Sequence, residues 1–444
     1  MDKQRYPISV KEGIKSLLIL LLACSAVFLA VRVFRSGTRV DVLIQGPVGT
    51  QTQTLSADSG KIAWPMRLAA ALPGDAGVER YGIQYNIQES DAFFQQTASL
   101  LSEALSSAEA PQKIDEGQWR SVLRSGPGIY FDFQGDLPLT VLAGWLSDQS
   151  CALEGTVRKV ALAIVDGQVL LCYRDVRNGQ FYACRTDVVN PDHLWEVTEP
   201  LTGNGAQFAF EMEEYGVLEP YTLLLSETPQ PRIYRASSAI GATTEDLVLL
   251  MEELHFPVES TAFYAAGDEQ VARNGEESIR LSKEGVVVYQ CDGSDSGRYH
   301  VARQGETASL LEMAEGCRAL AQQSIGSRCG EARLYLLSVQ SWEQGWQFTF
   351  GYSLNGIPVQ MEEGFAARFF VRDGQILSFS LNFRSYSDSG ETALMLPEFQ
   401  AMAAMESLGH AGEELVLIYP DRGGETIFPV WAAAGTISDA GNGG

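Results

Sequence analysis

The sequence has little of the side-chain chemistry on which enzymes and metal sites depend. Only four of its 444 residues are histidines, and none has a second histidine at the i, i+4 spacing of a metal-binding helix. They are His193, His255, His300 and His410. The sequence also contains no nucleophile elbow, no phosphate-binding loop and no dinucleotide-binding fingerprint. We therefore expect no catalytic, cofactor-binding or metal-binding residues, and we expect that the protein is not an enzyme.

Basic residues are also few. The chain holds 32 Lys and Arg against 56 Asp and Glu, a net charge of −24. Seven of the basic and two of the acidic residues lie within positions 1–39, so the rest of the chain keeps 25 basic and 54 acidic side chains and a net charge of −29. So acidic a surface repels the phosphates of nucleic acids and the head groups of anionic lipids. We therefore expect no nucleic-acid partner.

Cysteine is scarce as well, with seven residues and no CxxC pair. Six of the seven follow the first forty residues, and an even number permits disulfides in an exported domain. Cys172 and Cys184 lie nearly symmetrically about a turn at Asn178-Gly179, a placement that suits cross-strand neighbours. Cys317 instead falls on the apolar face of a predicted helix, as a buried thiol would. The sequence leaves the redox state open.

One segment imitates the first half of a calcium-binding loop. Residues 292–297 (DGSDSG) place oxygen donors at alternate positions and glycine at the sixth. The twelfth position, which supplies a bidentate carboxylate in such loops, is Arg303. A polar turn at the end of a strand is therefore the better interpretation.

Long hydrophobic runs are limited to one, near the N-terminus. Residues 16–31 (SLLILLLACSAVFLAV) carry no charge. About 20 helical residues cross a hydrocarbon core of about 30 Å, and residues 14–34 suffice if Lys15 and Arg32 extend their charges to the two interfaces. The basic residues before the run favour a cytoplasmic N-terminus. We predict a single-pass protein of the cell membrane, with a cytoplasmic N-terminus (1–14), a transmembrane helix (15–34) and the bulk of the chain outside the cytoplasm.

Two other interpretations of this run stay open. A basic start followed by apolar residues is also typical of a cleaved signal peptide, although no polar stretch of small residues precedes Arg32. Leu21-Leu22-Ala23-Cys24 loosely resembles a lipoprotein lipidation site, although apolar residues continue beyond Cys24. A retained anchor accounts best for the length of the run.

The remaining residues predict an α+β region in which helices pack on antiparallel meander sheets. A hydrophobic content of 45% with 10% aromatic residues excludes general disorder. We expect an N-terminal α+β domain (39–225), a middle domain or connector (241–300), a C-terminal helix-plus-meander domain (305–435) and a disordered tail (436–444).

Turn signals and apolar spacing place the elements of the first domain. The dipeptides Asp166-Gly167 and Asn178-Gly179 predict a three-stranded meander over 159–165, 168–175 and 180–187. We expect further strands at 40–44 and 128–133, and helices that begin near Ser90 or Asp91, at 116–123 and at 137–146. Residues 226–240, which include two prolines, predict a linker.

The rest of the chain has a clearer pattern. Ser309 and Glu312 match a capping box that begins a helix, and helices are also expected from Thr243 or Thr244 to Leu254 and over 397–408. Strands are expected at 262–266, 278–282, 286–290, 333–340, 346–354, 357–362, 366–372 and 376–383. Aromatic residues alternate from Trp346 to Tyr352, which predicts one buried sheet face.

Three stretches of the chain resemble the YycH family and, more distantly, the related YycI family. They are residues 128–147 (GIYFDFQGDLPLTVLAGWLS), residues 245–290 with their helix and short strands, and the C-terminal segments 348–360 (FTFGYSLNGIPVQ), 370–386 (FVRDGQILSFSLNFRSY) and 427–435 (IFPVWAAAG). Members of these families are Gram-positive membrane proteins with one helix in the membrane and an α+β body outside.

The resemblance implies a regulatory function without catalysis. It implies an accessory protein that associates with the cell-wall sensor histidine kinase of a two-component system, with a sister YycI-like protein as a further partner. The residues themselves leave open an extracytoplasmic ligand-binding or envelope-assembly module with no kinase link. A hydrolase would need a clustered nucleophile or an acid–base pair, which the sequence does not show.

Overall fold

The computed structural model describes residues 43–44, 63–74, 79–147, 151–187, 189–292, 297–301, 307–342 and 345–434. Every described residue belongs to one compact unit, which begins after residue 39. The predicted cytoplasmic segment, transmembrane helix and C-terminal tail lie outside the described residues. In the described part of the chain, no helix is both long enough and apolar enough to span a membrane.

Seven antiparallel strands form an N-terminal sheet in the order β3-β2-β5-β6-β7-β8-β4. Their bounds are β2 Arg67–Ala71, β3 Arg80–Gln84, β4 Gln112–Ile114, β5 Gly128–Pro138, β6 Thr156–Val165, β7 Gln168–Asp175 and β8 Phe181–Arg185. Asp166, Gly167 and Gly179 take the positive φ that tight hairpin turns require. The predicted meander of β6, β7 and β8 is therefore confirmed.

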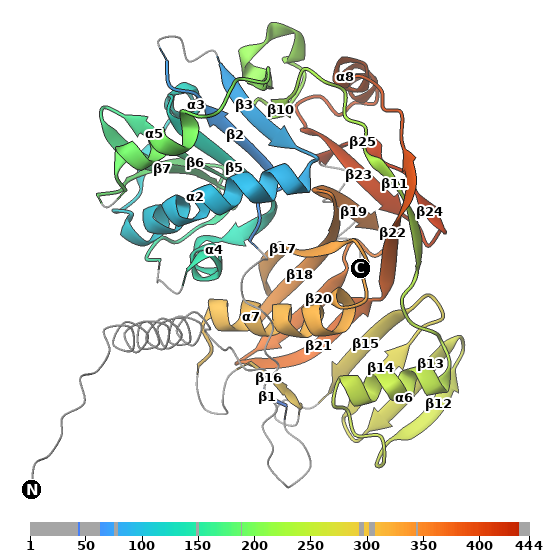
Figure 1. Ribbon diagram of the computed structural model, residues 1–444. Helices are drawn as coiled ribbons and strands as arrows, with labels where there is room; N and C mark the ends of the chain where they lie inside the picture. The colour runs from blue at the N-terminus through green and yellow to red at the C-terminus, as the bar shows by residue number, and fades with distance from the viewer. Residues whose placement is uncertain are drawn as a thin grey trace, which may run out of the picture. The chain divides into compact units, whose positions relative to one another are not determined.

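Helices cover both faces of this sheet. They are α2 Ile87–Ser107, α3 Glu116–Arg124, α4 Leu139–Leu146 and α5 Pro191–Thr198. Because side chains alternate along a strand, Phe131 of β5 joins the core under α2 and α4, whereas Tyr130 joins a second core with Trp119 of α3. Figure 1 shows α2 lying across the front of the sheet.

The expected start of α2 near Ser90 or Asp91 is wrong. The N-cap is Asn86, whose side-chain oxygen accepts from the Glu89 backbone N–H at 3.3 Å. Asparagine is as good an N-cap as serine or aspartate, so the local signals were ambiguous. Ser90 is instead buried in the first helical turn, where its hydroxyl donates to the Pro65 carbonyl.

Eight antiparallel strands form the C-terminal sheet in the order β17-β18-β20-β21-β15-β14-β13-β12. Their bounds are β12 Ala262–Ala266, β13 Glu269–Asn274, β14 Glu277–Leu281, β15 Val286–Cys291, β17 Arg333–Trp342, β18 Gly345–Leu354, β20 Ala367–Arg372 and β21 Gln375–Asn382. Helix α6 Thr244–Glu253 packs against β13, and α7 Leu310–Ala321 packs against β20 (Figure 1).

One face of the C-terminal sheet is a row of buried aromatic side chains. Phe348 pairs with Phe369, Phe369 with Phe379, and Phe379 with Tyr289, and all four are at most 1% exposed. The predicted aromatic face is therefore confirmed. The capping box of α7 is also confirmed, because Ser309 and Glu312 cap one another reciprocally.

The predicted linker at 226–240 is wrong. It contains β11 Arg232–Ser238, which pairs with β22 Arg384–Thr392 and β24 Thr426–Ile427. Both partner strands lie about 150 or more residues further along the chain, so no local sequence pattern could predict that β11 pairs with them. The prolines precede the strand instead of interrupting it, as expected for residues that cannot donate to a ladder.

The remaining elements complete the second half. β19 Ile357–Met361 pairs antiparallel with the end of β18 and parallel with β23 Leu415–Asp421, which in turn pairs with β25 Val430–Ala433. The others are β1 Leu43–Ile44, β9 Gln207–Phe208, β10 Leu223–Leu224, β16 Tyr299–His300, α8 Glu398–Ser407, the 3₁₀ turns Ala209–Glu211 and Glu213–Tyr215, and the π turn Gln322–Gly326. The fold is therefore α+β with antiparallel-rich sheets, as predicted, and the division into three domains stays a prediction.

The two sheets meet where β5 passes β17. Asp136 pairs with Ser338 in parallel register, after a shift in the β5–β6 ladder between Asp132 and Leu137. Gly135 lies within this shifted stretch of β5. A Cβ atom placed on it would lie 2.0 Å from the Leu336 carbonyl oxygen of β17. The close approach of the two backbones thus requires glycine at this position.

Candidate functional site

A network of buried and partly buried charges lies beside the junction of the two sheets. It comprises Arg67, Asp132, Arg158, Lys159, Glu219 and Glu414. Arg67 pairs with both Asp132 and Glu414, and each of these three side chains is at most 5% exposed. Arg158 Nη2 lies 2.9 Å from Glu414 Oε2, and its Nε lies 3.2 Å from Asp132 Oδ1.

Two acids of the network, Glu414 and Asp132, are held in their ionised form by the surrounding cations. Burial by itself would raise the pKa of the Glu414 carboxyl, but Arg158, Arg67 and Lys159 together hold it well below its usual range. The pKa of the Asp132 carboxyl is lowered in the same way. Burial raises it, but the nearby cations, Arg67 and Arg158 foremost, together lower it by more. The three positive and three negative members compensate one another, as buried ions must.

A polar cleft of about 290 Å³ opens beside this network. Its walls include Gln134 and Asp136 of β5, and Arg158 reaches it from β6. Its floor is the polar face of the C-terminal sheet, where Ser338, Thr349 and Arg368 are cross-strand neighbours. The opposite face of the same strands carries the buried aromatic row.

The backbone around this cleft is locally strained. Gln134 adopts a left-handed conformation with φ of 61°, which is uncommon for a residue other than glycine. Asp132 supports this geometry, because its carboxylate accepts from the Gln134 backbone N–H at 2.9 Å. Such strain concentrates at functional sites, so it singles out this part of β5.

The cleft offers groups that recognise small polar ligands. Arg368 stacks over the Phe365 ring with 4.1 Å between the guanidinium carbon and the ring centroid, and burial lowers its pKa. Burial also raises the pKa of the Asp136 carboxyl, against a smaller opposing effect of Arg158. Guanidinium, amide and hydroxyl groups together suit a ligand that carries carboxylate or amide groups.

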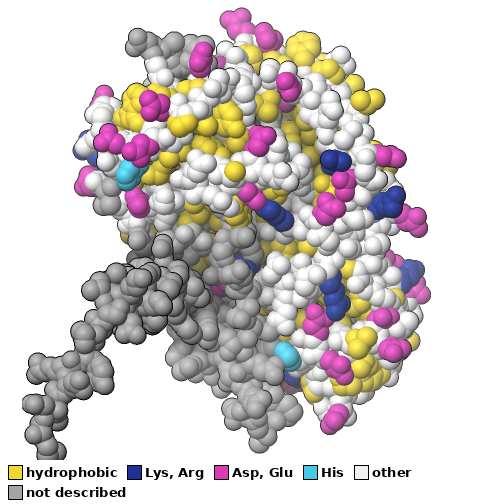
Figure 2. Space-filling model, viewed as in Figure 1, with side chains coloured by type: hydrophobic (Ala, Val, Ile, Leu, Met, Phe, Trp, Pro, Cys, Tyr) yellow, Lys and Arg dark blue, Asp and Glu magenta, His cyan; other side chains and the backbone are white. Residues whose placement is uncertain are grey.

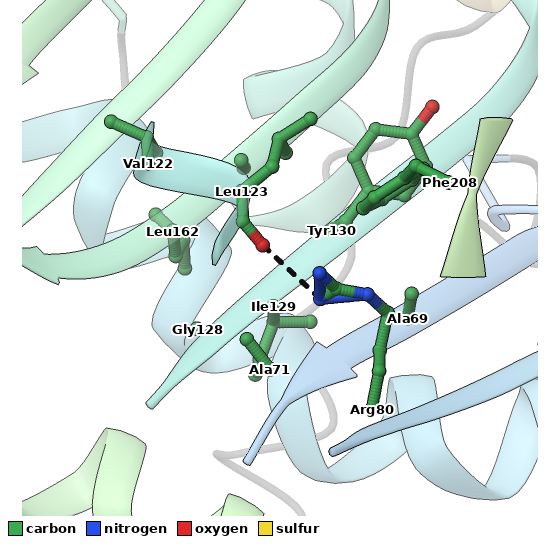
Figure 3. Close-up of a pocket in the computed structure, with 11 residues that line it drawn as sticks. Ala69, Ala71, Arg80, Val122, Leu123, Gly128, Ile129, Tyr130, Leu162 and Phe208 are labelled. Atoms are coloured by element: carbon green, nitrogen blue, oxygen red, sulfur yellow. Dashed lines mark hydrogen bonds between the residues drawn. The ribbon is translucent and has the colours of Figure 1, made fainter. Parts of the chain in front are cut away.

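A second cavity is too small for such a role. It lies between β2, β5 and α3, has a volume of about 10 Å³ and is therefore no larger than one water molecule requires. Figure 3 shows Arg80 lying in it and donating to the Leu123 carbonyl, at 3.2 Å. Arg80 also pairs with Glu211 at 3.0 Å and lies over the Phe208 ring. The cavity thus houses a structural arginine.

No protein-family model matches the chain, and no curated protein matches it. A solved structure does. The chain is similar to YycH from Bacillus subtilis, with a TM-score of 0.54 and 11% sequence identity over 87% of this chain and 96% of that one. The fold is YycH-like. The resemblance inferred from the sequence is thus confirmed at the level of the fold.

The histidines do not form a site. They lie in α5 (His193), after α6 (His255), in β16 (His300) and before β23 (His410), where His410 contacts Glu413 at 3.0 Å. Among the described residues, no three His, Cys, Asp or Glu side chains are grouped as metal ligands. Residues 293–296 of the calcium-like segment lie outside the described residues.

The expectation that Cys172 and Cys184 are cross-strand neighbours is wrong. Cys172 pairs with Ala183, and Cys184 pairs with Leu171. A register offset by one residue sends the two side chains to opposite faces of the sheet, one into each core. Cys317 is fully buried on α7, as predicted. Cys151, Cys172, Cys184, Cys317 and Cys329 are free thiols.

Sequence reasoning missed the charge network and the cleft. Their members come from positions between 67 and 434, so neither forms a motif. One signal was available. Asp132 interrupts the apolar strand Gly128–Phe133, and an acid at such a position needs a buried cationic partner.

Proposed function

We propose that this chain is a membrane-anchored accessory protein that regulates a cell-wall sensor histidine kinase by association. The observation that carries the proposal is the YycH-like fold, which extends over most of this chain and nearly all of YycH. The three stretches that resemble the YycH family in sequence give independent support. Membership in that family, the membrane anchor and the lack of catalysis are parts of the same proposal.

Such a protein acts without chemistry. A kinase with two conformations shifts toward the one that its accessory protein contacts more favourably. The small residues Ala23, Ser25, Ala26 and Ala30 in the predicted anchor favour close packing against another membrane helix. The ectodomain would then contact the sensor domain of the kinase or a sister protein.

The test is co-purification from living cells. The full chain, tagged at its N-terminus, is crosslinked in the cell and extracted in detergent, and its neighbours are identified by mass spectrometry. We expect a sensor histidine kinase among them, and we expect its loss when residues 16–34 are replaced by an unrelated membrane helix. Cys24→Ser is the matched control, which keeps the partner if the segment is an anchor and not a lipidation site. Recovery of wall-assembly proteins alone would contradict the proposal.

The orientation has its own test. Protease added to intact protoplasts should degrade the region after residue 39 and spare an N-terminal tag. Protection of the ectodomain would contradict an extracytoplasmic location.

The polar cleft favours a second candidate, an extracytoplasmic ligand-binding module. Its volume of about 290 Å³ lies at the lower end of the range for ligand pockets. Calorimetric titration of the purified chain with short peptides and cell-wall fragments tests this function. Binding that disappears in Arg368→Gln would support it, and the absence of heat with every fragment class would contradict it.

A further inference from the structure

The C-terminal sheet ends in an open edge strand. All five residues of β12, Ala262 to Ala266, are exposed, and in the described part of the chain β12 pairs with β13 alone. The strand at the opposite edge, β17, does pair with a further strand, because its Ser338 pairs with Asp136 of β5. The backbone N–H and C=O groups along the outer side of β12 are thus free to pair with another strand.

The side chains of β12 are unusual for an exposed edge. Natural edge strands carry charges, prolines or bulges that prevent another strand from adding. β12 reads Ala-Phe-Tyr-Ala-Ala, and its register with β13 runs unbroken from Ala262 to Ala266. Phe263 is 37% exposed and Tyr264 is 48% exposed. The strand is therefore apolar and has no charge, proline or bulge that would protect it.

Phe263 also continues the aromatic row of the sheet core. It pairs with Ala272, which pairs with Ile279, and Ile279 pairs with Tyr289. Those three residues are fully buried, so Phe263 is the first side chain of the row that is exposed to solvent. A further strand beside β12 would bury Phe263 in the same way that β13 buries Ala272.

The charge around this edge selects the occupant. Residues 241–292 hold eleven Asp and Glu but three Lys and Arg. Figure 2 shows the acidic side chains around hydrophobic atoms in this part of the molecule, at the lower right. A second copy would bring the same excess of acidic side chains to this edge, and surfaces of like charge repel one another. A basic partner fits and a second copy does not.

We propose that β12 is a docking edge for an extended strand of a different protein, apolar at its centre and flanked by Lys or Arg. Main-chain hydrogen bonds would supply the affinity, and Phe263 and Tyr264 would select the apolar side chains of the incoming strand. The inference rests on the proposed function, since it names the surface by which the accessory protein holds its membrane partner.

A photocrosslinker at the edge tests the proposal in living cells. The full chain carries p-benzoylphenylalanine in place of Tyr264, and the crosslinked peptide is sequenced. Trp195, which is 44% exposed on α5, takes the same replacement as a matched control. We expect position 264 to capture an apolar segment flanked by Lys or Arg, and we expect no such product from position 195.

A charge on the edge provides the second measurement. Tyr264→Lys should lower recovery of the captured partner by about tenfold, because it opposes the basic flanks and must be desolvated in a paired strand. Tyr264→Phe and Trp195→Lys should leave recovery unchanged. An unaltered circular dichroism spectrum shows that each variant is folded.

The outcomes separate the two proposals. Capture of a second copy, or no product at position 264, overturns the docking edge. If a sensor histidine kinase still co-purifies in that case, the proposed function stands. Capture of an unrelated protein by a basic-flanked strand supports the docking edge and contradicts the proposed function.

Discussion

Replacing Glu414 with glutamine should be among the most destabilising single changes in the chain. The Glu414 carboxylate is 5% exposed and lies within 4 Å of three cations, Arg67, Arg158 and Lys159. Glutamine keeps the shape but removes the charge, which leaves buried cations in excess over their counter-ions. Removing one partner of a buried ion pair costs about 3–5 kcal/mol, and the three contacts place Glu414 toward the upper end of that range. At about 4 kcal/mol the unfolding equilibrium shifts roughly a thousandfold.

The measurement is urea denaturation of the purified full chain, followed by tryptophan fluorescence. Glu413→Gln is the matched control, because it is the same change one residue away on a side chain that is 32% exposed. We expect that control to cost less than about 1 kcal/mol, as partly exposed pairs do.

The pH dependence gives a second check on Glu414. Its pKa is lowered in the folded state, so its contribution is present above its unfolded pKa, near 4.5, and is lost as pH falls below that value. The gap between wild type and Glu414→Gln should therefore narrow below about pH 4.5.

The coupling among these charges can also be measured. Arg158→Met in the Glu414→Gln background removes one of the excess cations. The loss of unfolding free energy in the double variant should therefore be smaller than the sum of the losses in the two single variants. A cost for Glu414→Gln no greater than for Glu413→Gln, or strict additivity in the cycle, would refute the account of a charge-balanced network.

Three further predictions concern other buried positions. Gly135→Ala should cost about 2 kcal/mol or more, because its Cβ would collide with the Leu336 carbonyl oxygen, and a melting temperature close to wild type would contradict the tight β5–β17 junction. Burial raises the pKa of Glu398 to about 8, so folding stability should fall as pH rises from about 4.5 to 8, and Glu398→Gln should remove that slope in denaturation measured across this range. Cys172 and Cys184 should resist alkylation in the native chain and react only on unfolding, because both are buried and burial raises the pKa of each thiol; mass spectrometry of labelled protein checks this.

Features set by a few neighbouring residues were readable from the sequence. The turn at Asp166-Gly167 and the capping box at Ser309 both depend on chemistry within four positions, and both are present as predicted. The aromatic alternation from Trp346 to Tyr352 identified a buried sheet face because a strand repeats every two residues. For these elements, the local sequence is sufficient to predict the structure.

Features set by distant partners were not readable. β11 follows two prolines, and its pairing with β22 is decided by residues about 150 positions away. The one-residue offset between Cys172 and Cys184 depends on where the turn closes, which a symmetric spacing cannot reveal. The cleft could not be predicted for the same reason, since the residues that line it come from β5, β6 and the C-terminal sheet.

The charge network has a role that stability alone does not explain. A buried ion cluster is weak evidence for stability, because apolar residues of similar size often do as well or better. Its charges are satisfied, however, in one arrangement of β2, β5, β6 and the segment that begins at Glu414. A slip of one residue in β5 would turn Asp132 toward the other face and leave Arg67 without its partner in that strand. The network therefore fixes the register of β5, and β5 is the strand that continues through Gly135 to the C-terminal sheet and carries Gln134 and Asp136 into the cleft.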